Sequence, residues 1–226
     1  MINPEIEAKI PYSRAAYWQL RSWILDNEMP AGYQATEQEV ASVLGMSRTP
    51  TREAMLRLEN EGLIELKSRH GMRVLPISTD DMREIYEILT GLEASAAASV
   101  AEKGANETEI AELESSVADM DQALDNDDLD SWMAADARFH HLLVDFSGNK
   151  RLASVVDIFL TQAARARKLT VKLRPKPTKS NIAHAAVVDA IKNRDSDRVW
   201  QVHMQHRKES GEMLIGLLQY LGFPHI

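Results

Sequence analysis

Four side chains in the C-terminal two-thirds of the sequence could together bind a metal ion: Asp136, His140, His184 and His206. Asp136 and His140 are four residues apart in a segment whose apolar residues recur at helical spacing, so both fall on the face that must be buried. His184 and His206 each fall within the apolar stripe of another expected helix. A buried carboxylate needs a partner. These positions therefore predict a shared polar site inside the protein.

The spacing of two histidines favours a metal site. His184 and His206 are each eleven residues from Asp195, the centre of an expected turn, so in an antiparallel hairpin they lie at equal height and can face each other. His203 would lie about 4.5 Å lower at the usual helical rise. One aspartate and three histidines suit a divalent ion such as Zn, Ni or Mn, with open coordination positions. The alternative is an ion pair within one helix and two unrelated core histidines.

The stretch MSRTPTREAMLRLENEGLI, residues 46–64, carries a second candidate chemistry. At helical spacing, Arg48, Thr49 and Arg52 fall on a face separate from the apolar stripe. Arginine can pair with guanine through two hydrogen bonds and can also bind phosphate. This face is therefore either a solvated charged surface or a DNA-contacting one.

The elements around this stretch favour DNA. A helix over 11–28, a short helix opened by the Thr36–Glu39 capping box and closed by Gly45, and a third helix ending at Gly62 precede two short strands. The strands flank a turn at His70 and Gly71. This order predicts a winged helix-turn-helix whose third helix enters the major groove.

From residue 78 onward the sequence predicts only helices. They are expected over 79–103, 107–124, 128–146, 150–173, 181–193 and 196–221, with caps at Ser78, Asn106 and Asp195 and a loop over 173–180. The fold class is therefore mainly α, with a winged helix-turn-helix DNA-binding domain at 1–77 and an all-α bundle at 78–226.

Composition and charge exclude several classes of protein and of site. The 226 residues include no cysteine, which excludes disulfides and thiolate ligands, and no apolar run long enough to span a bilayer. The acidic N-terminus is unlike a signal peptide, so a cytoplasmic protein without a membrane partner is expected. The net charge of −8 divides into −1 for residues 1–77 and −7 for residues 78–226. Residues 44–73 hold six basic and four acidic residues, too few for sequence-blind DNA binding.

The N-terminal sixty residues resemble the DNA-binding domain of the GntR family of bacterial transcriptional regulators. The matching segments are PAG, EQEVASVLG, SRTPTREAMLRLENEGLI and RHGMRV. The resemblance implies DNA contacts by Arg48, Thr49, Arg52, His70 and Gly71. Gln38 stands where some members have a further DNA-contacting arginine.

Residues 80–220 resemble the FCD ligand-binding domain of the FadR-like branch, through DARFHHLLVDFSGNKRL and the spacing of the later histidines. Members with this pattern bind a divalent metal, which implies Asp136, His140, His184 and His206 as ligands, and a small carboxylate effector beside it. Leu89 stands where many members have an arginine linked to that carboxylate. Arg165 and Arg167 could replace it, although we expect both to lie on solvated surface.

We therefore expect a homodimeric, ligand-responsive regulator, a repressor that binds a pseudo-palindromic operator, and not an enzyme. Two alternatives are a metal-responsive regulator and a metal-dependent enzyme fused to a DNA-binding head. No general base is evident beside the ligands, which argues against the enzyme.

Overall fold

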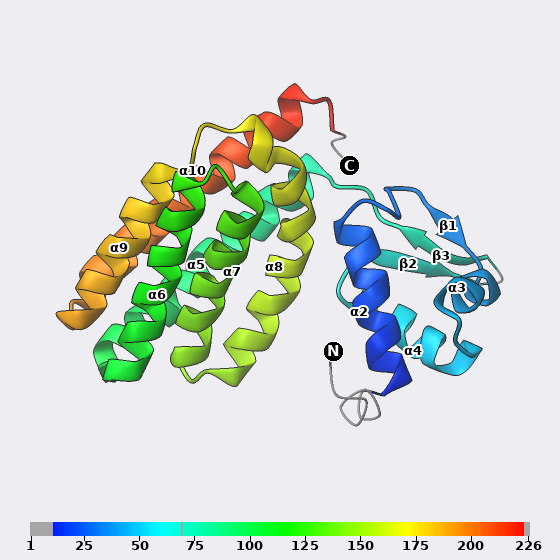
Figure 1. The fold of residues 1–226 in the computed structure, drawn as a ribbon, viewed down its shortest axis with the longest axis horizontal. Coiled ribbons are helices and arrows are strands. Elements are labelled where there is room, and N and C mark those ends of the chain that lie inside the picture. Colours follow the sequence, from blue (N-terminus) through cyan, green and yellow to red (C-terminus); the bar gives the residue numbers. More distant parts are fainter. Residues whose placement is uncertain (1–10, 69, 224–226) are drawn as a thin grey trace. The chain divides into compact units, whose positions relative to one another are not determined.

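The computed structural model describes residues 11–68 and 70–223. The chain divides into two compact units, Met1–Ile77 and Ser78–Ile226, and each is described by itself (Figure 1). The mainly α fold class, with a winged helix-turn-helix followed by a helical bundle, is confirmed.

The N-terminal unit contains three described helices and a small sheet. Its elements are α2 (Tyr12–Leu25), β1 (Gln34–Ala35), α3 (Glu37–Leu44), α4 (Arg48–Asn60), β2 (Ile64–Lys67) and β3 (Gly71–Val74). The strands are antiparallel in the order β1-β3-β2, with Ile64 opposite Val74 and Lys67 opposite Gly71. The two-residue strand β1 was not predicted, since two residues show no alternation.

Local sequence explains where the helices of this unit begin and end. The predicted capping box is confirmed: Glu39 N donates to Thr36 Oγ1, and the Glu39 carboxylate accepts from Thr36 N at 2.7 Å. Gly45 ends α3 in the left-handed conformation. The buried apolar core of the unit includes Ala16, Leu20, Ile24, Val40, Ala54, Met55, Leu58, Ile64, Met72 and Val74.

The C-terminal unit is built only of helices within its described residues. They are α5 (Thr79–Lys103), α6 (Glu107–Asp125), α7 (Leu129–Phe146), α8 (Lys150–Thr170), the short 3-10 helix η1 (Val171–Leu173), α9 (Thr178–Lys192) and α10 (Ser196–Tyr220). The predicted caps at Ser78, Asn106 and Asp195 are confirmed by hydrogen bonds from backbone N–H groups one turn ahead. The helix expected from residue 181 begins instead at Thr178, inside the predicted loop.

Helix α5 is the centre of the bundle. It packs against α7, α8, α9 and α10, and Figure 1 shows α6, α7 and α8 side by side. The apolar core includes Ala97, Val100, Leu113, Met120, Phe139, Leu143, Val187, Ile191 and Val199. This packing brings α7, α9 and α10 together, and these are the helices that carry the predicted metal ligands.

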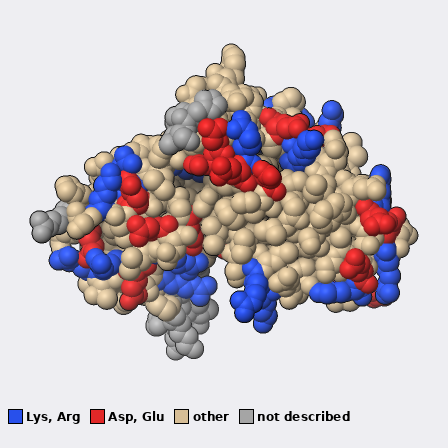
Figure 2. Space-filling model, turned by 180° about the vertical axis from the view of Figure 1, so that it is seen from behind, with Lys and Arg blue, Asp and Glu red and all other residues tan. Residues whose placement is uncertain are grey.

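The charged side chains on the surface agree with the weak local excess of basic residues counted in the sequence. Figure 2 shows one face, on which the described Lys, Arg, Asp and Glu side chains are interspersed and form no extended basic area. None of the helices in the described part of the chain has both the length and the apolar character that a bilayer span requires.

Candidate functional site

The structure brings the four predicted ligands into one buried cluster. Asp136 and His140 come from adjacent turns of α7, His184 comes from α9 and His206 from α10. One ligand atom from each residue lies within 4.8 Å of every other. His184 and His206 face each other, with 4.6 Å between ring centroids, as the hairpin spacing predicted.

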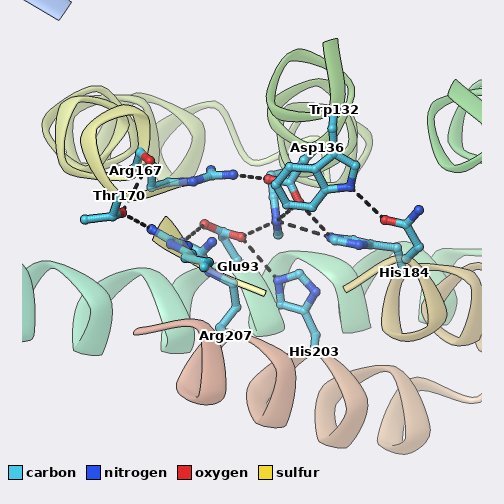
Figure 3. A network of polar contacts seen from close by, with 11 residues as sticks. Glu93, Trp132, Asp136, Arg167, Thr170, His184, His203 and Arg207 are labelled. Atoms are coloured by element: carbon cyan, nitrogen blue, oxygen red, sulfur yellow. Dashed lines mark hydrogen bonds and ion pairs between the residues drawn. The ribbon is translucent and has the colours of Figure 1, made fainter. Parts of the chain in front are cut away.

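The contacts inside the cluster converge on one oxygen of the aspartate. Asp136 Oδ1 lies 3.5 Å from His184 Nε2 and 3.8 Å from His140 Nε2, and these two nitrogens are 3.3 Å apart. The other oxygen, Oδ2, accepts a hydrogen bond from Arg167 of α8. Figure 3 shows Arg167 and His184 approaching Asp136 from different helices. The inner oxygen therefore stays directed at the histidines.

Burial and neighbouring charges hold Asp136, His184 and His206 in the protonation states that a metal ligand needs. Burial lowers the pKa of His184 to about 3, and burial followed by the neighbouring histidines lowers the pKa of His206 well below its usual value. Burial alone would raise the pKa of Asp136, but the charge of Arg167 and the histidines outweigh it and lower this pKa. The cluster thus places a charged Asp136 beside imidazoles of His184 and His206 that burial keeps neutral.

Glu93, which the sequence analysis did not assign, supports the cluster from behind. It is fully buried on α5, and its Oε2 lies 2.7 Å from His140 Nδ1 and 3.2 Å from His203 Nε2. Its Oε1 lies 3.0 Å from Arg207 Nη2. A carboxylate that accepts the outer ring N–H of a histidine fixes the ring and directs its inner nitrogen at a metal. Glu93 and His203 therefore form an outer layer around His140.

The donor set fits a divalent metal ion. Three imidazole nitrogens and one carboxylate oxygen converge, and a second carboxylate orients one of the imidazoles. Borderline metals such as Zn, Ni and Mn accept this mixture of nitrogen and oxygen.

A cavity of about 580 Å³ opens beside the cluster. Asp136, His140 and His206 line it, together with Trp132, Tyr86 and several basic side chains. Open coordination positions would face this space, whose volume is typical of small-molecule sites.

Arg165 is buried and the side chain of Arg167 is only 13% exposed, so the expectation of solvated surface is wrong for each. Arg167 lines the cavity and contacts Asp136, whereas Arg165 is buried and lies outside the residues that line the cavity. Leu89 is fully buried and does not line the cavity either. Arg167 is therefore already paired with Asp136, and Arg165 cannot reach a ligand in the cavity.

The candidate DNA-contacting residues lie on the surface of the N-terminal unit. The side chains of Arg48 and Arg52, in the first turns of α4, are 66% and 65% exposed, and Thr49 between them is also exposed. The opposite face of α4 is buried through Thr51, Ala54, Met55 and Leu58.

The predicted wing is the β2–β3 turn. His70 is exposed, with its Nδ1 2.9 Å from the carbonyl oxygen of Ser68. Gly71 has φ +80°, and a Cβ there would lie 2.1 Å from the carbonyl oxygen of Ala35. The close approach of β1 to β3 thus already requires glycine at this position.

Comparisons with known proteins agree with both units. The family model "Bacterial regulatory proteins, gntR family" matches residues 12–74, and the FCD domain model matches residues 84–208. An HTH-type transcriptional regulator from the TAR-I ttuE-ttuC' intergenic region of Agrobacterium vitis is 42% identical over 132 residues, covering 58% of this chain and 77% of that protein.

Two further relatives cover almost the whole chain. The HTH-type transcriptional repressor RspR of Escherichia coli (strain K12) is 25% identical over 211 residues, covering 93% of this chain and 92% of RspR. The solved structure of E. coli McbR/YncC has the same fold, with a TM-score of 0.78 at 18% identity over 93% of this chain and 99% of that one. These relatives are transcriptional regulators and not enzymes. The chain belongs to the GntR family of bacterial regulatory proteins and carries the FCD domain of that family.

Proposed function

We propose that the chain is a homodimeric repressor whose affinity for its operator is controlled by a small organic acid bound beside a divalent metal ion. The buried Asp136–His140–His184–His206 cluster, opening on a cavity of about 580 Å³, is the observation that carries the proposal. A metal-only sensor needs the cluster but not the cavity. The cavity therefore favours an organic effector over the metal-responsive alternative.

The four cluster residues would hold the metal. When bound, the metal supplies Lewis-acid positions on which a carboxylate oxygen of the effector can bind. Glu93 fixes the ring of His140, and Arg167 holds the outer oxygen of Asp136 in place. The protein would thus keep the four metal ligands buried and correctly oriented.

The N-terminal unit would read the operator through Arg48, Thr49 and Arg52 in the major groove, with His70 and Gly71 at the wing. A two-fold symmetric dimer requires two related half-sites. The effector would act by favouring one arrangement of the dimer over another. Repression is supported by the name of RspR, which is similar over 93% of this chain. Work on chromosomal DNA would place the protein in the cytoplasm.

The DNA half of the proposal is tested with a sequence selected by the parent protein from random duplexes. We expect a palindromic site, and we expect Arg52→Ala to weaken binding to it by roughly 10- to 100-fold, the worth of one bidentate arginine–guanine pair. Arg83→Ala removes an equal charge from an exposed position of α5 and should bind like the parent. An Arg52→Ala protein that binds as tightly as the parent would contradict the assignment of α4.

The metal half is tested by elemental mass spectrometry of protein purified without chelator. We expect about one metal ion per chain, lost in His184→Ala. His141→Ala is the matched control, because His141 is exposed and adjacent to His140. Protein that neither contains metal nor takes it up on soaking would refute the metal site.

A further inference from the structure

The cavity beside the metal cluster is basic, although the unit around it is acidic. Six Lys or Arg and two Asp or Glu residues line the cavity, giving four surplus positive charges. Residues 78–226 as a whole hold 17 basic and 24 acidic residues. A concentration of one sign in a hollow raises the local concentration of ligands of the opposite sign. The charge of the cavity therefore favours an anionic ligand.

Three of the cavity's cations already have carboxylate partners within the protein. Arg167 contacts Asp136, Arg207 lies 3.0 Å from Glu93, and Lys176 lies 2.7 Å from an oxygen of Asp127. Figure 3 shows Arg167 beside Asp136 and Arg207 beside Glu93 in the same polar network. Because Glu93 and Asp127 do not themselves line the cavity, these pairs reduce the surplus from four positive charges to two, carried by the remaining cations.

Arg174, directly after η1, has no such partner. Within the described part of the chain its side chain donates to Thr170 Oγ1 only, no carboxylate lies within ion-pair distance of it, and its Nε is buried without an acceptor. Burial, aided by the charge of nearby Arg167, lowers the pKa of Arg174. An arginine left in this state is costly unless a ligand supplies the acceptor.

Arg174 and the metal cluster line the same cavity, so one molecule can contact both. A monocarboxylate bound at the cluster would leave Arg174 without an anionic partner. We propose, on the basis of the proposed function, that the effector is a small acid with two anionic groups, one bound at the Asp136–His140–His184–His206 cluster and the second bound by Arg174. The second group is a carboxylate or a phosphate, since the planar guanidinium fork pairs with either.

The test is calorimetric titration of the full-length, metal-containing protein. The probes are dicarboxylates of three to six carbons and 3-phosphonopropionate, each compared with the straight-chain monocarboxylate of equal carbon count. We expect at least one two-acid probe to bind about tenfold or more tightly than its monoacid, the usual worth of a charged hydrogen bond. Tighter binding of the phosphonate than of the dicarboxylates would identify the second group as phosphate-like, and the reverse order would identify a carboxylate.

Substitutions of Arg174, with a control at Lys172, test where the second anionic group of the effector binds. Arg174→Gln should abolish the preference while leaving the dissociation constants of the monoacids unchanged. Arg174→Lys keeps the charge and should retain part of the preference, which covers the case of a poorly folded glutamine variant. Lys172→Gln removes a charge from η1 at an exposed position that does not line the cavity, and it should behave like the parent.

Failure of the two-anion inference can be distinguished from failure of the proposed organic-acid effector. Equal affinity for one-acid and two-acid probes, or equal weakening of both by Arg174→Gln, overturns this inference and leaves an acid-binding site beside the metal intact. Binding of no acid by the metal-containing parent overturns the inference together with the proposed organic-acid effector.

Discussion

The carboxylate of Glu37 binds both arginines that the proposed function assigns to DNA. Its Oε1 accepts from Arg48 Nε at 3.0 Å and its Oε2 accepts from Arg52 Nη1 at 3.1 Å. Slight burial acts to raise the pKa of Glu37, but the two arginines outweigh it and lower this pKa. A charged Glu37 therefore both orients the arginines and opposes the approach of phosphates.

Replacing Glu37 by glutamine should relax the sequence specificity of DNA binding. The variant removes the negative charge and releases both arginines, so affinity for random duplexes should rise about two- to fivefold, the range expected for exposed ion pairs. Affinity for the selected operator should rise less or fall, because the arginines are less well oriented. Fluorescence anisotropy with operator and scrambled duplexes at several salt concentrations measures both changes.

Glu53→Gln is the matched control for this prediction. Glu53 is exposed on α4 and, among the described residues, forms no ion pair with Arg48 or Arg52, so its replacement makes the same change in net charge without releasing either arginine. If the two variants changed the ratio of operator to scrambled affinity equally, Glu37 would contribute only net charge and the orienting role would be wrong.

The residues of the candidate site differ in whether they could be predicted from the sequence. Asp136, His140, His184 and His206 could be proposed because a polar residue inside an apolar stripe is visible from periodicity alone. Glu93 also lies within a buried stripe, beside Ala94 and Ala97, but its partners are on α7 and α10. Such pairings between distant segments leave no local pattern.

Helices were easier to predict than the elements between them, for a physical reason. Caps such as Ser78 and Asn106 satisfy backbone groups within one turn, so the chemistry that sets the helix start is local. Strand β1 exists because β3 lies beside it. Thr178 begins α9 after two prolines, where the sequence predicted only a loop. The features that the sequence did not predict are those that depend on contacts with other segments of the chain.

The contact between α5 and α10 depends on a glycine. A Cβ at Gly211 would lie 2.7 Å from ring carbon Cδ1 of Tyr86, whereas one at Gly216 would meet nothing within 4 Å. Both glycines are on α10. We expect Gly211→Ala to lower the free energy of unfolding by roughly 1–3 kcal/mol through overpacking. Gly216→Ala should raise it by up to about 1 kcal/mol through helix propensity.

Urea denaturation followed by circular dichroism checks this pair. The opposite signs are the informative outcome, because helix propensity alone would make both variants more stable. Stabilisation by Gly211→Ala would mean that Tyr86 moves aside at little cost. Since Tyr86 also lies under Arg207 and lines the cavity, the variant should weaken acid binding as well.

The two units divide the chemistry of the whole chain. All four candidate metal ligands belong to Ser78–Ile226, and all five candidate DNA contacts belong to Met1–Ile77. The metal cluster joins α7 to the consecutive helices α9 and α10, so a bound ion would tie them together only in the folded state. Metal binding should therefore act on the stability of the helical unit directly.

Removing the metal should lower the stability of the helical unit and leave the N-terminal unit folded. A ligand that binds only the folded state stabilises it by about 2.7 kcal/mol at a hundredfold excess over its dissociation constant. Differential scanning calorimetry with and without a chelator should show this loss for the parent and for His141→Ala. His184→Ala should melt at the same temperature with and without chelator, because the ion has lost a ligand. An equal shift in His184→Ala would mean that the stabilising ion binds elsewhere, and the cluster would then be a buried polar network held by Arg167 and Glu93 alone.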